Sequence, residues 1–261
     1  MDYKGFVAQL KDSELSELSE MWKKLNLEWK LCSGLTVKVR NHAEWKAYND
    51  IFVDREYDFP INQALNSRQT PNQFTFLDLG ANVGFFTIRV ADIILQSDNS
   101  AIDFHGILVE GSPSVYLELE QRIQEEPLLV KKLTLIKGLI GKRAGFGEIF
   151  ESDFHITNSI YSKNSLGRSS EVPYVDLDAF YQGDAEIDLL KSDIQGSELS
   201  FLENYNQDLL KRVRCAIFEL HHDVCDPDHC LSILREEFAN HQPLKEKTSH
   251  LSNLSVHFFW R

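Results

Sequence analysis

Residue types that bind ligands gather at one turn of the sequence. In FTFLDLGANVGFFTIRVADIIL, an apolar run typical of a buried strand passes into an amphipathic pattern typical of a helix, and between them stand Asp78, Gly80, Asn82 and Gly84. Glycines there let the backbone approach a ligand closely, and the amides that begin the helix point at that ligand. The spacing is D-x-G-x-x-x-G rather than the G-x-G-x-x-G of dinucleotide loops, and an acid before the turn suits a cationic amine.

A second acidic residue follows one strand–helix unit later. Glu110 ends the run FHGILVEG, where a carboxylate can accept hydrogen bonds from both hydroxyls of a ribose, and we count Ser112 just beyond it as a contact of the same ligand. An amine, a carboxylate and a ribose together describe S-adenosylmethionine, which we therefore predict as the cofactor. In the alternative interpretation, Asn82 only caps a helix and Asp78 only stabilises a buried turn.

Strands that alternate with helices must position these residues. From Phe74 onward the runs typical of strands are FTFLDLG, FHGILVEG, LTLIKGLIG, IDLLKSDIQG and RCAIFELH, and helical stretches separate most of them. This alternation predicts an α/β protein with a doubly wound, mostly parallel sheet, whose ligands bind beyond the carboxyl ends of the strands. GFGEIFES and EVPYVDLDAF add short β-like runs, and LSNLSVHFFWR predicts a C-terminal antiparallel strand.

The N-terminal part has a different pattern. A helical stripe is followed by the strand-like GLTVKVR, a helical HAEWKAYNDIF and a loop, QALNSRQTPNQ; the stripe consists of Leu15, Leu18, Trp22, Leu25 and Trp29. We expect residues 1–70 to form a helical extension or lid and residues 71–261 to form the cofactor-binding domain. Three roles stay open for this stripe: part of the hydrophobic core, a lid over the substrate, or the contact surface of a homodimer.

Composition narrows the classes of partner. The chain has 261 residues and a net charge of −13, without a basic block, which disfavours nucleic acid and anionic membrane surfaces. No apolar run approaches the ~20 residues of a membrane helix, and the N-terminus lacks the pattern of a signal peptide. The four cysteines have no disulfide-framework spacing. We expect a cytoplasmic protein that acts on a small molecule.

Two motifs in this order resemble the FkbM family of S-adenosylmethionine-dependent methyltransferases. FLDLGANVGFFTIRVA is similar to the family's Asp-x-Gly-Ala-Asn-x-Gly turn, and IDLLKSDIQGSELSFLEN to its Leu-Leu-Lys-Ile-Asp-Val-Glu-Gly-x-Glu signature, within a likeness that spans roughly residues 45–235. The resemblance implies a Rossmann-like class I methyltransferase fold and methyl transfer, usually to a hydroxyl of a sugar or natural-product scaffold. Ser192 and Gln195 depart from the signature, where the family has an aliphatic residue and Glu.

The resemblance also implies roles for individual residues that match the family's motifs. The resemblance makes the turn residues and Glu110 cofactor contacts, and it places Leu139 and Ile140, after the third strand, beside the adenine ring.

The far strands carry candidates for acid–base chemistry. Asp193 ends the fourth strand, where the methyl group should lie, although it could instead cap the next helix. Glu219 and His221 lie in FELHHDVCDPDHC, whose spacing matches no standard zinc pattern. Two interpretations stay open: Mg²⁺ or Mn²⁺ held by Asp193, Glu219 and one neighbour, or His221 as a metal-free general base. Glu198 is explained by the helix dipole.

These observations predict a methyltransferase that acts on a small-molecule hydroxyl. N-methylation of a small-molecule amine is one alternative. The other is a catalytically degenerate member that binds cofactor as a subunit, because Gln195 replaces the family's Glu.

Overall fold

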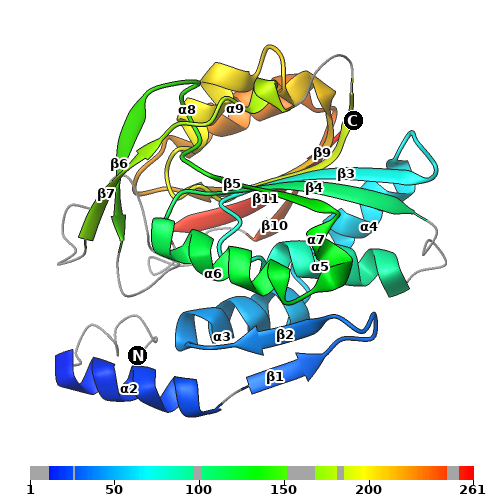
Figure 1. The fold of residues 1–261 in the computed structure, drawn as a ribbon. Coiled ribbons are helices and arrows are strands. Elements are labelled where there is room, and N and C mark those ends of the chain that lie inside the picture. The colour runs from blue at the N-terminus through cyan, green and yellow to red at the C-terminus, as the bar shows by residue number, and fades with distance from the viewer. Residues whose placement is uncertain (1–11, 26, 97–101, 152–167, 181–184, 246–252) are drawn as a thin grey trace.

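A seven-stranded sheet runs through the middle of the protein in the computed structural model, which describes residues 12–25, 27–96, 102–151, 168–180, 185–245 and 253–261 (Figure 1). The strand order is β10-β11-β9-β8-β3-β4-β5. The strands are β3 (Gln73–Leu79), β4 (Asp103–Glu110), β5 (Leu133–Lys137), β8 (Ile187–Ser192), β9 (Val213–His221), β10 (Asn240–Lys245) and β11 (Leu254–Trp260).

One strand near an edge of this sheet, β11, runs opposite to the other strands. Strands β9, β8, β3, β4 and β5 are parallel, whereas β11 is antiparallel to both β9 and β10, between which it lies. The chain leaves β3 for β4 on one side and later returns to β8 on the other, so strand order reverses at β3. The arrangement confirms the predicted Rossmann-like class I methyltransferase fold with its C-terminal antiparallel strand.

Helices cover both faces of the sheet. On one face lie α4 (Asp58–Ser67), α5 (Phe85–Gln96), α6 (Pro113–Gln124) and α7 (Pro127–Val130), and on the other lie α8 (Glu198–Tyr205) and α9 (Pro227–Glu237) (Figure 1). All six residues of β8 are buried, as expected for a central parallel strand enclosed by helices. None of the helices in the described ranges is long and apolar enough to cross a membrane.

The N-terminal region packs against the helical layer of α4 to α7, on the side away from the sheet (Figure 1). It comprises α2 (Asp12–Leu25), the antiparallel pair β1 (Leu27–Lys30) and β2 (Thr36–Val39), α3 (His42–Tyr48) and a π-helix, η1 (Asn49–Val53). The predicted helical stripe was wrong at its end, because Trp29 belongs to β1, where it lies opposite Val37. The predicted loop QALNSRQTPNQ was wrong at its start, because Ala64 and Leu65 continue the buried face of α4.

Two further β elements complete the described chain. Strands β6 (Phe146–Glu151) and β7 (Arg168–Pro173) form an antiparallel pair beside the central sheet (Figure 1). The predicted run GFGEIFES contains β6, but only Glu171–Pro173 of EVPYVDLDAF belong to β7, and the later part of that run forms the 3₁₀ helix η3 (Leu177–Ala179). Strand β10 was not predicted, because NHQPLK is polar and contains proline. An edge strand tolerates both features, since one of its sides faces no partner strand.

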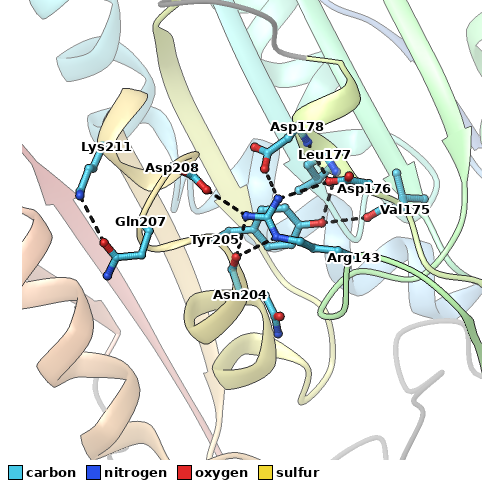
Figure 2. A network of polar contacts seen from close by, with 10 residues as sticks. All are labelled: Arg143, Val175, Asp176, Leu177, Asp178, Asn204, Tyr205, Gln207, Asp208 and Lys211. Atoms are coloured by element: carbon cyan, nitrogen blue, oxygen red, sulfur yellow. Dashed lines mark hydrogen bonds and ion pairs between the residues drawn. The ribbon is translucent and has the colours of Figure 1, made fainter.

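Arg143, in the connection between β5 and β6, anchors the carboxyl end of α8 (Figure 2). Its guanidinium donates to the carbonyl oxygen of Asn204 over 2.9 Å and lies over the ring of Tyr205 at 4.6 Å. The Tyr205 hydroxyl donates to the carbonyl oxygen of Val175 over 3.0 Å, so α8 is also fixed to the segment after β7. The acidic partners of the guanidinium are Asp176, Asp178 and Asp208. A cation at a helix carboxyl end is favourable, so this network holds α8 in one position.

A buried ion pair joins α6 to the N-terminal region, and we expect its loss to destabilise the protein. Arg122 donates to the carbonyl oxygen of Lys38 over 2.6 Å and to Glu44 Oε2 over 3.1 Å, and both charged side chains are buried. Arg122→Met leaves the buried charge of Glu44 without its buried cation, so the free energy of unfolding should fall by about 3–5 kcal/mol in urea denaturation.

The matched control is Lys38→Met, which removes the exposed ion pair to Glu125 but keeps the backbone carbonyl. It should cost less than about 1 kcal/mol. Equal losses in the two variants would contradict the assigned role of the buried pair.

Candidate active site

The glycine turn follows β3 at the point where strand order reverses. Gly80, Asn82 and Gly84 have φ angles of 74°, 50° and 86°, which lie in the left-handed region. A Cβ atom at Gly80 would stand 1.8 Å from the carbonyl oxygen of Asp193 at the end of β8. Glycine is therefore required at this position by the neighbouring strand, independently of any ligand.

Asp78 lies beneath the turn rather than on its surface. The side chain is fully buried, and Oδ2 accepts a hydrogen bond from Thr87 Oγ1 over 2.9 Å. Oδ1 is 3.5 Å from Nζ of Lys191, and burial raises the pKa of the carboxyl. Within the described chain, Asp78 supports the turn through these two partners, and its contact with a cofactor amine stays a prediction.

Glu110 is held rigidly at the end of β4, next to the turn. Its Oε2 accepts from the backbone amide of Asn82 and its Oε1 from that of Ser112, each over 2.8 Å. Burial raises the pKa of Glu110 to about 7, against the opposing effect of these two amides. A carboxylate has about four acceptor positions, so two remain for hydroxyls of a ligand.

The other predicted cofactor residues border the same edge. Ser112 is buried and caps α6, where its hydroxyl accepts from the amide of Val115. Leu139 and Ile140 are buried just beyond β5, and the amide of Gly138 donates to the carbonyl of Glu110. The carboxyl ends of β3, β4 and β5 thus bring all eight predicted residues to one edge of the sheet.

The three predicted catalytic residues converge at the ends of β8 and β9. One potential ligand atom from each of Asp193, Glu219 and His221 lies within 4.8 Å of the others. Nε2 of His221 is 3.6 Å from Glu219 Oε1 and 3.9 Å from Asp193 Oδ1. Asp193 does not cap α8, whose N-cap residue is Ser197.

Burial and charge shift the pKa values of this cluster. Burial, together with the charge of Asp193, raises the pKa of Glu219 to about 8. Burial alone would lower the pKa of His221. Its hydrogen bond to Glu198 and the surrounding carboxylates outweigh that effect and raise the pKa to about 9. Glu219 and His221 are therefore largely protonated at neutral pH, and they release protons as pH rises through about 8 and about 9.

Glu198 is a site residue that the sequence analysis missed. The side chain is 0% exposed, and Oε1 lies 3.0 Å from Nδ1 of His221, across the gap between α8 and β9. The sequence alone explains Glu198 mostly by the dipole of the helix whose first turn it occupies. The available signal was its position as the closing Glu of the signature IDLLKSDIQGSE.

The remaining residues of FELHHDVCDPDHC have other partners. Nε2 of His222 lies 2.8 Å from Ser255 Oγ, and Asp226 caps α9 by accepting from the amide of His229. Cys230 lies on the buried face of α9, in the core. Within the described residues, these side chains do not join the group of Asp193, Glu219 and His221.

The N-terminal region supplies a charged border to this cluster. Lys46 Nζ lies 3.0 Å from Asp50 Oδ2 at the junction of α3 and η1. Burial would lower the pKa of Lys46, but the charges of Asp50, Glu219 and Glu56 raise it. The charge of Glu219 therefore acts on the α3–η1 junction. Single π-helical turns often occur at functional sites.

Comparison with known proteins identifies one family. The family model described as Methyltransferase FkbM domain matches residues 78–240, more than half of the chain. Among curated proteins, no significant sequence match is found.

Solved structures with a similar chain path share little sequence with this protein. Methyltransferase FkbM from Methylobacillus flagellatus KT is 13% identical, and the match covers 94% of this chain and 59% of that chain with a TM-score of 0.46. The N-terminal domain of human METTL16 is 8% identical over 97% and 94%, with a TM-score of 0.46. M. capricolum TrmK, solved with S-adenosylhomocysteine, is 10% identical over 78% and 68%, with a TM-score of 0.40. Likenesses at this level do not identify a substrate.

The raised pKa of Glu110 predicts a specific pH dependence of stability. The folded protein favours protonated Glu110, so this stabilisation is complete below pH 4.5 and is lost as pH rises through about 7. Relative to Glu110→Gln, the unliganded wild type should lose about 3 kcal/mol at most in free energy of unfolding between these pH values. Denaturation at a series of pH values measures it.

Glu120→Gln on α6 serves as the control, because its side chain lies outside the site. It should leave the wild-type pH profile unchanged. Parallel profiles for wild type and Glu110→Gln would show that Glu110 is not the group that responds.

Proposed function

We propose that this chain, which belongs to the FkbM methyltransferase family, transfers a methyl group from S-adenosylmethionine to a hydroxyl group of a small molecule. Membership of the family rests on the match over residues 78–240. Methyl transfer is the activity of that domain, whereas the cofactor assignment and the class of acceptor are our inferences from the site.

The observation that carries the cofactor assignment is the fixed carboxylate of Glu110 beside the glycine turn. Two backbone amides hold its oxygens, and its remaining acceptor positions suit the two hydroxyls of a ribose. The start of α5 directs amides at the same edge, and Leu139 and Ile140 offer apolar surface for adenine. The site thus has a suitable group for each part of the nucleoside. Bound S-adenosylmethionine would supply an electrophilic methyl group on its sulfonium.

The cluster at β8 and β9 supports a hydroxyl as the acceptor. A neutral hydroxyl is a weak nucleophile, and a base that takes its proton contributes typically 10²–10⁴-fold to the rate. In its neutral form, which the raised pKa makes predominant only above about pH 9, His221 is the candidate base and would receive that proton on Nε2, while Asp193 orients the hydroxyl. A neutral amine needs less help from a base, so the cluster favours O-methylation over N-methylation. It also argues against a subunit that only binds cofactor.

The same residues fit a divalent cation. Two carboxylates and one imidazole nitrogen, with potential ligand atoms within 4.8 Å of one another, form a donor set suited to Mg²⁺ or Mn²⁺. Such an ion would acidify and orient a bound hydroxyl, and Asp193, Glu219 and His221 would hold it. The metal-dependent and the metal-free interpretation involve the same residues. The effect of metal removal on turnover distinguishes them.

Charge also bears on the acceptor. Acidic side chains dominate the cluster and the whole chain has a net charge of −13, which makes a polyanionic acceptor unfavourable. Lys46 and Asp50 at the α3–η1 junction provide polar groups that can bind hydroxyls. We therefore propose a neutral or cationic small molecule, such as a sugar or another polyhydroxylated scaffold.

Cofactor binding is tested first. S-adenosylmethionine and S-adenosylhomocysteine should raise the melting temperature as ligand concentration increases. Glu110→Gln should weaken binding by about 1–3 kcal/mol, because a charged acceptor of hydrogen bonds is lost. Titration calorimetry measures the affinity, with Glu120→Gln as the control. Stabilisation by NAD⁺ but not by these two ligands would refute the assignment.

Turnover tests the reaction itself. Labelled S-adenosylmethionine with panels of sugars, phenols and amines should yield a methylated hydroxyl, identified by mass spectrometry. Asp193→Asn should lower turnover by ~10²-fold or more, the size of a lost acid–base or electrostatic group, while cofactor affinity changes only a few-fold. Product methylated only on nitrogen would replace the proposal with its alternative.

Metal dependence separates the two interpretations of the cluster. If Asp193, Glu219 and His221 hold an ion, exhaustive chelation should abolish turnover and Mg²⁺ or Mn²⁺ should restore it, with cofactor affinity unchanged. Full activity after chelation would eliminate the metal and leave His221 as the base. Chelated Asp193→Asn is the control for effects of the chelator itself.

A further inference from the structure

We infer that Glu198 is a positioning residue, which holds the imidazole of His221 so that Nε2 faces the acceptor of the methyl group. The inference rests on the proposed function, because it assigns the atom of His221 that works in the reaction. It also adds a residue outside the predicted catalytic set.

The hydrogen bond between the two side chains defines the ring's orientation. Oε1 of Glu198 is 3.0 Å from Nδ1 of His221, and Glu198 is fully buried. A carboxylate only accepts hydrogen bonds, so the shared proton is on Nδ1. In the neutral ring, Nε2 then carries the lone pair that can take a proton or bind a cation.

Nε2 points toward the acidic pair. It lies 3.6 Å from Glu219 Oε1 and 3.9 Å from Asp193 Oδ1, on the side of the ring opposite Glu198. In both interpretations the same atom acts: Nε2 of His221 is the proton acceptor in one and the metal ligand in the other. Glu198 is therefore needed in either interpretation, as the carboxylate partner of a base or as the second partner of a ligating histidine.

A purely structural role explains Glu198 poorly. A buried carboxylate is costly unless both oxygens find donors, yet no donor in the described chain reaches its Oε2. The favourable interaction with the dipole of α8 would be available to an exposed side chain as well. Among the described residues, His221 is the side chain that hydrogen-bonds to this buried carboxylate, so the position serves the imidazole.

The frame around the pair keeps it rigid. Glu198 begins α8, and Arg143 and Tyr205 fix the other end of this short helix. His221 ends β9, which is hydrogen-bonded to β8 on one side and to β11 on the other. Both partners thus stand on regular elements, as a precise catalytic geometry requires.

The decisive variant is Glu198→Gln, which keeps size and shape but can donate an N–H to Nδ1. The amide stabilises the tautomer with the proton on Nε2, where it blocks a base or a ligand. We expect kcat to fall by ~10²–10⁴-fold, while KM for the cofactor and the cofactor-induced rise in melting temperature stay near wild type. Glu203→Gln, an exposed position on the same helix, is the matched control and should retain full activity.

Coupling to His221 is tested by a double variant. If Glu198 acts through the ring, Glu198→Gln combined with His221→Gln should be no slower than His221→Gln alone. Additive losses would show that Glu198 acts independently of the ring and would overturn the inference.

A spectroscopic readout does not depend on activity. The proton between Nδ1 and a buried carboxylate should give a far-downfield resonance in NMR of ¹⁵N-labelled protein, coupled to Nδ1. It should vanish in Glu198→Gln and persist in Glu203→Gln. A wild-type signal on Nε2 alone, or full turnover in Glu198→Gln, would overturn the inference. If no acceptor is methylated by wild type, the proposed function fails, and the resonance still decides the ring's orientation.

Discussion

The buried ammonium group of Lys191 is the contact on which both halves of the site depend. Its Nζ lies 3.5 Å from Asp78 Oδ1, 3.6 Å from Asp193 Oδ2 and 3.3 Å from the carbonyl oxygen of Gly80, to which it donates. It therefore connects the acid beneath the turn, the turn itself and the acid at the end of β8. Burial would lower the pKa of Lys191, but the charges of Asp78 and Asp193 raise it and keep the group charged. Removing Lys191 would leave the fully buried carboxylate of Asp78 without its cation, whereas removing Asp193 leaves Asp78 as the partner of the ammonium.

This contact explains why the cofactor edge and the acid–base cluster occupy fixed positions relative to each other. Gly80 lets the end of β8 approach the turn, since a side chain there would collide with the carbonyl of Asp193. The amide of Asp193 donates to the carbonyl of Leu79 over 3.0 Å, which extends the pairing of β3 and β8 beyond the strands. The proposed cofactor edge and the proposed acid–base cluster would then be aligned without a moving part.

The sequence predicted the elements whose signals are local. Apolar runs marked the five parallel strands, and the glycine spacing marked the turn, because its left-handed backbone requires residues that tolerate it. Asp193, Glu219 and His221 could be grouped because parallel strands end at one edge of the sheet. Glu198 could not be paired with His221 in the same way, since the distance between a helix start and a strand end depends on tertiary packing. Trp29 was predicted to lie in a helix because its helical spacing gave no sign of its pairing with β2. Strand β10 was missed because an edge position tolerates a polar, proline-containing sequence.

The position of β11 in the sheet has a consequence for biogenesis. Among the described strands of the sheet, β11 is the last in sequence, yet it lies between β9 and β10 and pairs with β9 from Cys215 to His221, which lies opposite Leu254. Until the ribosome has released residues 254–260, the outer edge of β9 has no partner strand. A nascent chain therefore exposes an apolar strand edge, rich in backbone donors and acceptors, to neighbouring chains. Chaperone capture during this interval would protect the protein from aggregation, and truncation before Leu254 would leave that edge permanently open.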